Sequence, residues 1–200
     1  METAFTEIYA KKRWGEGSGS GSKMTPDNKE YISLLQSIIN EKGIQSICDI
    51  GCGDWGFSQY INFAGVQYLG IDCVKSVIDD NKRKYEKENI NFQHKSIDAN
   101  YIPEGFDLII VKDVIQHWED DEILHYMDHI IKKNKYVFST NGYKFMRDPV
   151  KNTILKRNIN NPYRYHPVSL DKYPLCEFKQ HSIMIKHRRA KQMVLFKYQI

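Results

Sequence analysis

The 200-residue sequence contains no apolar run that approaches the ~20 residues of a membrane-spanning helix. Its first residues, METAFTEIYAKKRWGE, also lack the apolar region of a secretory signal, so we expect a cytoplasmic protein that does not engage a membrane.

The four cysteines form no C-x-x-C pair, and we interpret them as reduced, small apolar side chains in and near strands rather than as disulfides. We predict no metal site. A length of 200 residues suits one domain, and a net charge of +4 is compatible with an anionic substrate.

Residues 46–60, with the sequence SICDIGCGDWGFSQY, combine a short apolar run, a glycine-rich turn and a polar continuation. Gly51, Gly53 and Gly56 fit the pattern G-x-G-x-x-G, in which glycine lets the backbone approach a ligand closely. A turn between a strand and a helix also needs glycine for purely structural reasons. The pattern alone therefore leaves the ligand open.

The charges around this turn narrow the choice of ligand. Asp49 and Asp54 flank the glycines, and residues 46–60 contain no lysine or arginine. A loop that binds pyrophosphate needs backbone N–H groups without nearby carboxylates, because like charges repel. The turn is therefore suited to a positively charged ligand.

The stretch DIGCGDWG resembles the first motif of the class I S-adenosylmethionine-dependent methyltransferases. The resemblance implies S-adenosylmethionine as cofactor, S-adenosylhomocysteine as product, and cofactor contacts around this turn. An acid some twenty residues further on, Asp72, can accept hydrogen bonds from both ribose hydroxyls. In the family an acid at the place of Asp98 caps the adenine amino group, although a solvent-facing turn would also explain Asp98. The expected cofactor-binding residues are Asp49, Gly51, Cys52, Gly53, Asp54, Trp55, Asp72, Cys73, Asp98 and Lys112.

Hydrophobic periodicity predicts alternating strands and helices. Helices are expected at 26–42, 56–63, 74–87 and 120–133, and strands at 44–50, 66–74, 90–94, 107–111 and 135–140. The charged run at 79–88 is expected to face solvent. Two alternating stretches, 177–186 and 192–200, predict a terminal antiparallel hairpin, as in the resembled family. The fold class is thus α/β: a doubly wound, Rossmann-like, seven-stranded sheet that is mostly parallel and ends in an antiparallel C-terminal hairpin.

The N-terminal residues 1–24 precede a single methyltransferase domain, residues 25–200. Residues 15–22 read GEGSGSGS, a composition typical of flexible linkers. The preceding segment is aromatic and basic, however, which favours a mobile lid over the site. Both interpretations stay open. If the segment is a lid, its substrate contacts would be Tyr9, Trp14, Ser18 and Ser20.

A second informative stretch, residues 106–118, reads FDLIIVKDVIQHW. A buried central strand here would deliver the polar residues that follow it to the ligand crevice. The D-V-I-Q-H portion matches the family, which implies His117 as general base, with Asp113 in reserve, and substrate contacts from Gln116 and Trp118. Residues 141–175 lose regular periodicity and are expected to form a substrate-selecting insertion. Its candidate contacts are Arg147, Arg157, Tyr163, Arg164, Tyr165 and His166.

These observations predict a methyltransferase acting on an oxygen or nitrogen of a small, anionic acceptor. The chain also resembles short bacterial methyltransferases associated with surface-glycan pathways, which implies a capsule or other glycan precursor as acceptor. An RNA or protein methyltransferase is one alternative, although no appended RNA-binding module is recognisable and nucleic acid is not expected as a partner. A non-catalytic, cofactor-binding partner subunit is the other.

Overall fold

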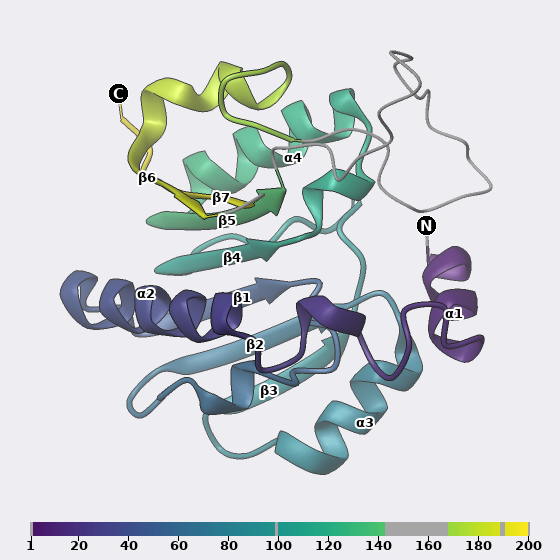
Figure 1. The fold of residues 1–200 in the computed structure, drawn as a ribbon. Helices are drawn as coiled ribbons and strands as arrows, with labels where there is room; N and C mark the ends of the chain where they lie inside the picture. Colours follow the sequence, from purple (N-terminus) through teal and green to yellow (C-terminus); the bar gives the residue numbers. More distant parts are fainter. Residues whose placement is uncertain (1, 99, 143–167, 189–190, 200) are drawn as a thin grey trace. The chain divides into compact units, whose positions relative to one another are not determined.

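The computed structural model describes residues 2–98, 100–142, 168–188 and 191–199. The chain forms two compact units, Met1–Ser96 and Ile97–Ile200. The strands are β1 (Ser46–Ile50), β2 (Gln67–Asp72), β3 (Ile90–His94), β4 (Leu108–Lys112), β5 (Tyr136–Gly142), β6 (Ser182–Arg188) and β7 (Lys191–Phe196). They form a seven-stranded sheet in the order β3-β2-β1-β4-β5-β7-β6 (Figure 1). The predicted α/β fold class is confirmed.

In the first unit, three parallel strands are accompanied by three helices, α1 (Glu2–Ala10), α2 (Pro26–Lys42) and α3 (Lys75–Tyr85). The strands provide most of the core of this unit, with Ile47, Tyr68, Ile71 and Phe92 almost fully buried. Figure 1 shows α1 on the side of the unit toward which the β1 arrow points. This is the carboxyl edge of the strands, where ligands bind in open α/β sheets.

Helix α2 begins and ends at the residues that the sequence indicates. The Thr25 side chain accepts a hydrogen bond from the backbone N–H of Asn28 at 3.2 Å, and Pro26 occupies the first helical position. Gly43 ends the helix in the left-handed conformation, at φ 60°, which glycine adopts without steric cost.

The helix expected at 56–63 is wrong. Only Ser58–Tyr60 form a short 3-10 helix, and Ile61 is already extended, at φ −85° and ψ 135°. Phe57, Ile61 and Phe63 are all buried, and the last two lie two residues apart, which is a spacing of extended chain rather than of a helix. The Gln36 side chain from α2 also holds the backbone of Asn62, accepting from its N–H at 3.0 Å and donating to its carbonyl at 3.3 Å. Tertiary contacts therefore override the local preference for a helix.

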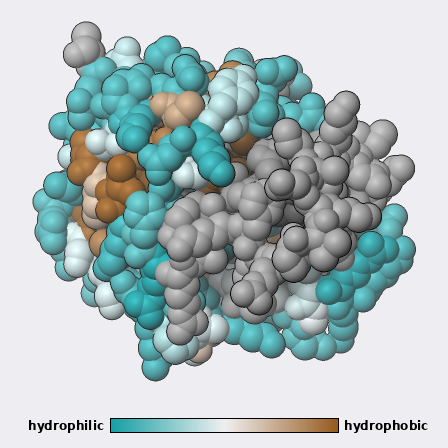
Figure 2. Space-filling view, turned by 45° about the horizontal axis from the view of Figure 1, so that its top comes forward, coloured by the Kyte–Doolittle hydropathy of each residue, from teal (hydrophilic) through white to brown (hydrophobic). Residues whose placement is uncertain are grey.

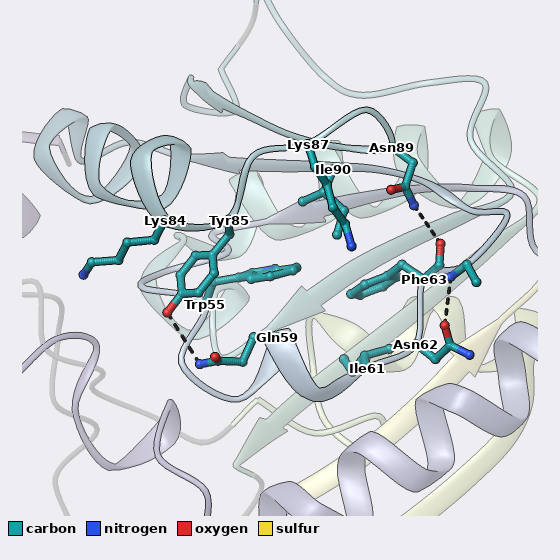
Figure 3. A pocket seen from close by; sticks show the side chains of 11 residues that line it. Trp55, Gln59, Ile61, Asn62, Phe63, Lys84, Tyr85, Lys87, Asn89 and Ile90 are labelled. Atoms are coloured by element: carbon teal, nitrogen blue, oxygen red, sulfur yellow. Dashed lines mark hydrogen bonds between the residues drawn. The ribbon is translucent and has the colours of Figure 1, made fainter.

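The first unit has a hollow of about 410 Å³, which Ile61 and Phe63 help to line (Figure 3). Trp55 and Phe63 lie in it as nearly parallel rings with centroids 5.9 Å apart, and Tyr85 comes from the end of α3. Ile90, the first residue of β3, also lines it. The hollow therefore lies near the amino end of β3, not at the carboxyl edge.

The second unit contains β4, helix α4 (Asp120–Lys133), β5 and the terminal hairpin. Helix α4 has the bounds that the sequence predicts, and Glu119 and Glu122 form a capping box at its start. β7 pairs antiparallel with β6, as the predicted hairpin requires, and also with β5, so the last strand lies between them. The start of the hairpin differs from the prediction: Leu175–His181 form a 3-10 helix, and β6 begins only at Ser182.

The surface in Figure 2 is mainly hydrophilic, with a smaller group of hydrophobic residues near its left side. None of the helices in the described part of the chain is long and apolar enough to cross a membrane. Most of the predicted insertion, residues 143–167, lies outside the described residues, whereas Asn141 and Gly142 belong to β5.

Candidate functional site

The glycine-rich turn after β1 is held in a conformation that requires glycine. Gly51 and Gly53 have φ values of 68° and 57°, in the left-handed region. The backbone N–H groups of Gly51 and Cys52 donate to the Ile71 carbonyl at 2.8 and 3.0 Å. A Cβ atom at Gly53 would lie 2.5 Å from the Ser18 hydroxyl oxygen. The turn is thus fixed against β2 and closely approached from the N-terminal segment.

Asp72 ends β2 directly beside this turn. Its carboxylate accepts hydrogen bonds from the backbone N–H groups of Gly53 at 3.0 Å and Val74 at 2.9 Å. Burial raises the pKa of Asp72 although these hydrogen bonds favour its charged form. Asn81, expected to face solvent, is instead buried and donates to the Gly53 carbonyl at 2.7 Å.

The second acid of the turn, Asp49, is buried within β1 and accepts a hydrogen bond from the Tyr68 hydroxyl at 2.7 Å. The nearby cysteines are poor nucleophiles, because burial raises the pKa of both Cys48 and Cys52. Burial, reinforced by the charge of Asp72, likewise raises the pKa of Cys73 to about 12.

Asp54, the third acid, contacts the N-terminal segment. Its carboxylate accepts hydrogen bonds from the Ser18 backbone N–H at 2.8 Å, from the Ser22 hydroxyl, and from the Gly56 N–H at 3.1 Å. The Ser18 hydroxyl oxygen in turn accepts from the Asp54 N–H at 2.8 Å and lies 2.6 Å from the Tyr9 hydroxyl. The residues predicted to form a lid or linker are therefore packed on the turn.

The two predicted tryptophan contacts, Trp14 and Trp55, each pack against other aromatic rings. Trp14 lies against Phe5 and Tyr9, with ring centroids 5.8 Å apart in both pairs. Trp55 is buried among Phe63, Tyr68, Tyr85 and Phe92, which gives this predicted cofactor contact a packing role as well. The side chain of Ser20 lies outside the described part of the structure.

In the second unit, Asp113 follows β4 with a φ of 60°. Its carboxylate lies 3.2 Å from the Lys112 Nζ and also forms an ion pair with Lys191, the first residue of β7. Burial opposes ionisation of Asp113, but the charges of Lys112 and Lys191 outweigh it and hold the pKa of Asp113 well below its usual range. Asp113 is therefore a poor general base at neutral pH.

The other residues after β4 lie in a short 3-10 helix, Ile115–His117, and at its end. His117 is partly exposed, and its Nε2 lies 3.4 Å from the Gln116 Nε2. Trp118 is buried, with its ring centroid 5.1 Å from that of Tyr126, so the structure gives this predicted substrate contact a place in the core. The buried side-chain oxygens that lack a hydrogen-bond partner among the described residues include Gln116 Oε1, Thr140 Oγ1 and Asn141 Oδ1.

Asp98 is exposed, and its carboxylate accepts from the backbone N–H groups of Asn100 at 2.8 Å and Tyr101 at 3.1 Å. It thus stabilises its own turn, which agrees with the solvent-facing interpretation. The remaining candidates lie outside the described residues: Arg147, Arg157, Tyr163, Arg164, Tyr165 and His166.

The sequence analysis missed Ser22, Asn81 and Lys191. Ser22 belongs to the GSGS repeat and could have been included with Ser18. Lys191 gives no local signal, because it is 78 residues from Asp113 and meets it only through the pairing of β5 with β7. The described residues include no group of His, Cys, Asp and Glu side chains that could hold a metal ion.

The first unit fits S-adenosylmethionine. The turn presents glycine backbone at Gly51 and Gly53, Asp72 offers a carboxylate for ribose hydroxyls, and Asp49 adds a second negative charge near a cationic ligand. Residues 48–139 match the family model described as a methyltransferase domain. The chain belongs to the class I S-adenosylmethionine-dependent methyltransferases. S-adenosylmethionine is the methyl donor of this family.

The relatives of this methyltransferase are distant. It is 22% identical over 139 residues to the mitochondrial ubiquinone biosynthesis O-methyltransferase of Schizosaccharomyces pombe, covering 64% of this chain and 51% of the relative. It is 25% identical over 177 residues to the corresponding protein of Hydrogenovibrio crunogenus, covering 79% of this chain and 70% of the relative. The chain spans about half the length of the Schizosaccharomyces protein and of a Coxiella burnetii relative.

Two solved structures show the same fold. Magnesium protoporphyrin IX methyltransferase from Synechocystis, with bound S-adenosylmethionine, matches with a TM-score of 0.64 and 13% identity, covering 98% of this chain and 97% of that one. The N-methyltransferase NodS from Bradyrhizobium japonicum, in complex with S-adenosylhomocysteine, matches with a TM-score of 0.65 and 14% identity, covering 96% and 97%. At this identity the likeness supports the fold alone.

Proposed function

We propose that this methyltransferase acts on an oxygen or nitrogen atom of a small, anionic acceptor. The observation that carries the proposal is the group formed by Lys112, Asp113 and Lys191, in which two lysines share one carboxylate. The two lysines outnumber the carboxylate in this group, and Lys191 is 39% exposed. A carboxylate or phosphate group of the acceptor would be attracted to the lysine ammonium groups.

Asp113 contributes by orienting the two lysines. Its ionised carboxylate fixes Lys112 and Lys191 before the acceptor arrives, so less side-chain entropy is lost on binding. The unpartnered oxygens of Gln116, Thr140 and Asn141, taken among the described residues, add hydrogen-bond acceptors in the same unit. They suit hydroxyl or amine groups of the acceptor, because a buried acceptor oxygen without a donor is unfavourable.

Bound S-adenosylmethionine supplies an electrophilic methyl group on a positively charged sulfur. The chain's own residues then have to position the acceptor and, if its reacting atom is a neutral hydroxyl or a protonated amine, remove one proton. We propose that His117, which is the histidine of the D-V-I-Q-H stretch and is partly exposed, removes this proton. If the reacting oxygen is already anionic, no base is needed and His117 would donate a hydrogen bond.

A precursor of capsule or another surface glycan fits this acceptor class. Such precursors combine hydroxyl groups with phosphate or carboxylate groups, which match the unpartnered oxygens and the lysine pair. The resemblance of the chain to short bacterial glycan-associated methyltransferases supports the same choice.

The test compares Lys191→Met with Lys179→Met. Lys179 forms an ion pair with Asp171 at 2.8 Å in the same unit and serves as the control. Formation of S-adenosylhomocysteine is measured with sugar phosphates, uronic acids, and neutral sugars and amines. We expect turnover of an anionic compound whose KM rises about tenfold or more in Lys191→Met and stays unchanged in Lys179→Met. A preference for neutral acceptors, or equal KM values in both variants, would refute the anionic class.

A further inference from the structure

The strongest unexplained feature is the interlocking of the Gly/Ser segment, residues 15–22, with the turn at Cys52–Gly56. A Cβ atom at Gly17 would lie 1.8 Å from the Asp54 Oδ2, and one at Gly56 would lie 2.7 Å from the Ser22 carbonyl oxygen. The two stretches therefore approach so closely that both must carry glycine at the contact. The Ser18 backbone N–H and the Ser22 hydroxyl donate hydrogen bonds to the Asp54 carboxylate.

Tyr9 extends this contact to the donor-binding residues. Its hydroxyl lies 2.6 Å from the Ser18 Oγ and 3.6 Å from the position of a Cβ on Gly53. Burial raises the pKa of Tyr9, and the negative charge of Asp72 raises it further. The N-terminal segment is thus a wall of the same site that contains Gly53 and Asp72.

The role of Asp54 follows from its partners. Three donors already contact its carboxylate: the Ser18 N–H, the Ser22 hydroxyl and the Gly56 N–H. A carboxylate with these partners has little capacity left to compensate a ligand cation. The charge of the donor is better matched by Asp49 and Asp72, which lie in β1 and at the end of β2.

We propose that the Gly/Ser segment is a gate over the donor site and that Asp54 is its latch rather than a ligand of the cofactor. S-adenosylmethionine enters and S-adenosylhomocysteine leaves when the hydrogen bonds from Ser18 and Ser22 to Asp54 open. The proposal rests on the chain's membership of the methyltransferase family and is independent of the acceptor. It also assigns Tyr9 to the donor side, whereas the sequence analysis placed it on the substrate.

The test measures the dissociation rate of S-adenosylhomocysteine directly, by stopped-flow fluorescence after mixing with excess S-adenosylmethionine. The variant is Ser18→Ala combined with Ser22→Ala, which removes both hydroxyl groups from the latch and leaves Asp54 in place. The control is Ser33→Ala, because Ser33 also donates a side-chain hydrogen bond, to the Lys29 carbonyl at 3.1 Å, but lies exposed on α2.

We expect dissociation to become about 10- to 100-fold faster in the double variant and to stay unchanged in the control, since one to two hydrogen bonds would no longer resist opening. A rate within twofold of the parent would overturn the proposal. This readout needs no acceptor, so it can fail or succeed separately from the anionic acceptor class.

If the double variant does not fold, hydrogen exchange of the parent protein decides the question. The amides of Ser18 and Asp54 donate to each other's side chains, at 2.8 Å in both cases. Bound S-adenosylhomocysteine should slow their exchange, because a closed gate keeps these hydrogen bonds formed. If bound S-adenosylhomocysteine leaves the exchange rates of both amides unchanged, the gate proposal is refuted.

Discussion

The substitution Gly17→Ala gives a quantitative test of how the N-terminal segment is held. Gly15 and Gly17 both have positive φ values, 83° and 63°. An alanine at either position costs about 1 to 2 kcal/mol for the left-handed conformation alone. The two sites differ in space, since a Cβ at Gly15 has no described atom within 4 Å, whereas one at Gly17 meets the Asp54 carboxylate.

The difference between Gly17→Ala and Gly15→Ala therefore isolates the contact with Asp54. To admit the methyl group, the Asp54 side chain must turn away and lose the hydrogen bond from the Ser18 N–H. A hydrogen bond to a charged group contributes about 1.5 to 3 kcal/mol. The equilibrium for opening the segment should thus shift about 10- to 150-fold further in Gly17→Ala than in Gly15→Ala.

Amide hydrogen exchange, followed by mass spectrometry on peptides that cover residues 14–24, measures this opening. In the regime where exchange reports the opening equilibrium, the ratio of the two rates gives the free-energy difference directly. Peptides from α2 provide an internal reference for global unfolding. Equal acceleration of exchange in both variants would show that Asp54 does not hold the segment, and the close contact at Gly17 would then have no energetic role.

Three further outcomes follow from the same structure. Asp72→Ala should weaken S-adenosylhomocysteine binding about 10- to 100-fold by calorimetry, and because burial raises the pKa of Asp72, affinity in the parent should fall as the pH decreases through that raised value. Asp113→Asn should lower the unfolding free energy by about 1 to 3 kcal/mol, because the partly exposed lysines lose their charged partner. Because the folded-state pKa of Asp113 is depressed, this difference should be constant between about pH 5 and pH 8 and vanish only in strong acid, which urea titrations can check. Asn81→Ala should cost about 1 to 3 kcal/mol and loosen the turn, because the Gly53 carbonyl loses its donor; an unchanged melting temperature would contradict this.

The elements that the sequence predicts best are those with local end signals. Helix α2 is bounded by Thr25, Pro26 and Gly43, and α4 by the Glu119 capping box, so both are fixed by interactions within a few residues. The helix expected at 56–63 fails because its apolar residues pack around Trp55 and its backbone is held by Gln36. Neither contact is visible in a periodicity argument.

The residues of the candidate site also differ in how far they can be predicted from the sequence. Gly51, Gly53 and Asp72 are predictable because a strand, a turn and the next strand place them by chain order. The ion pair of Lys191 with Asp113 joins residues far apart in the sequence, and the bond between Ser18 and Asp54 spans 36 residues. Pairings of this kind depend on how the chain returns to the sheet, which a single sequence does not reveal.

The Gly/Ser run shows why composition alone left two interpretations open. Small residues are required both where a chain must be flexible and where two backbones must come close. The structure shows both situations within this run. A Cβ atom on Gly15 would have no described atom within 4 Å, whereas a Cβ on Gly17 would meet Asp54 and one on Gly19 would meet Trp14. Gly15 is therefore the position where the backbone can turn without displacing a neighbour, and the residues after it are shaped to dock. If the gate opens, its pivot should lie at Gly15, and Gly15→Ala should make the closed form less stable only through the left-handed backbone, without a clash at Asp54.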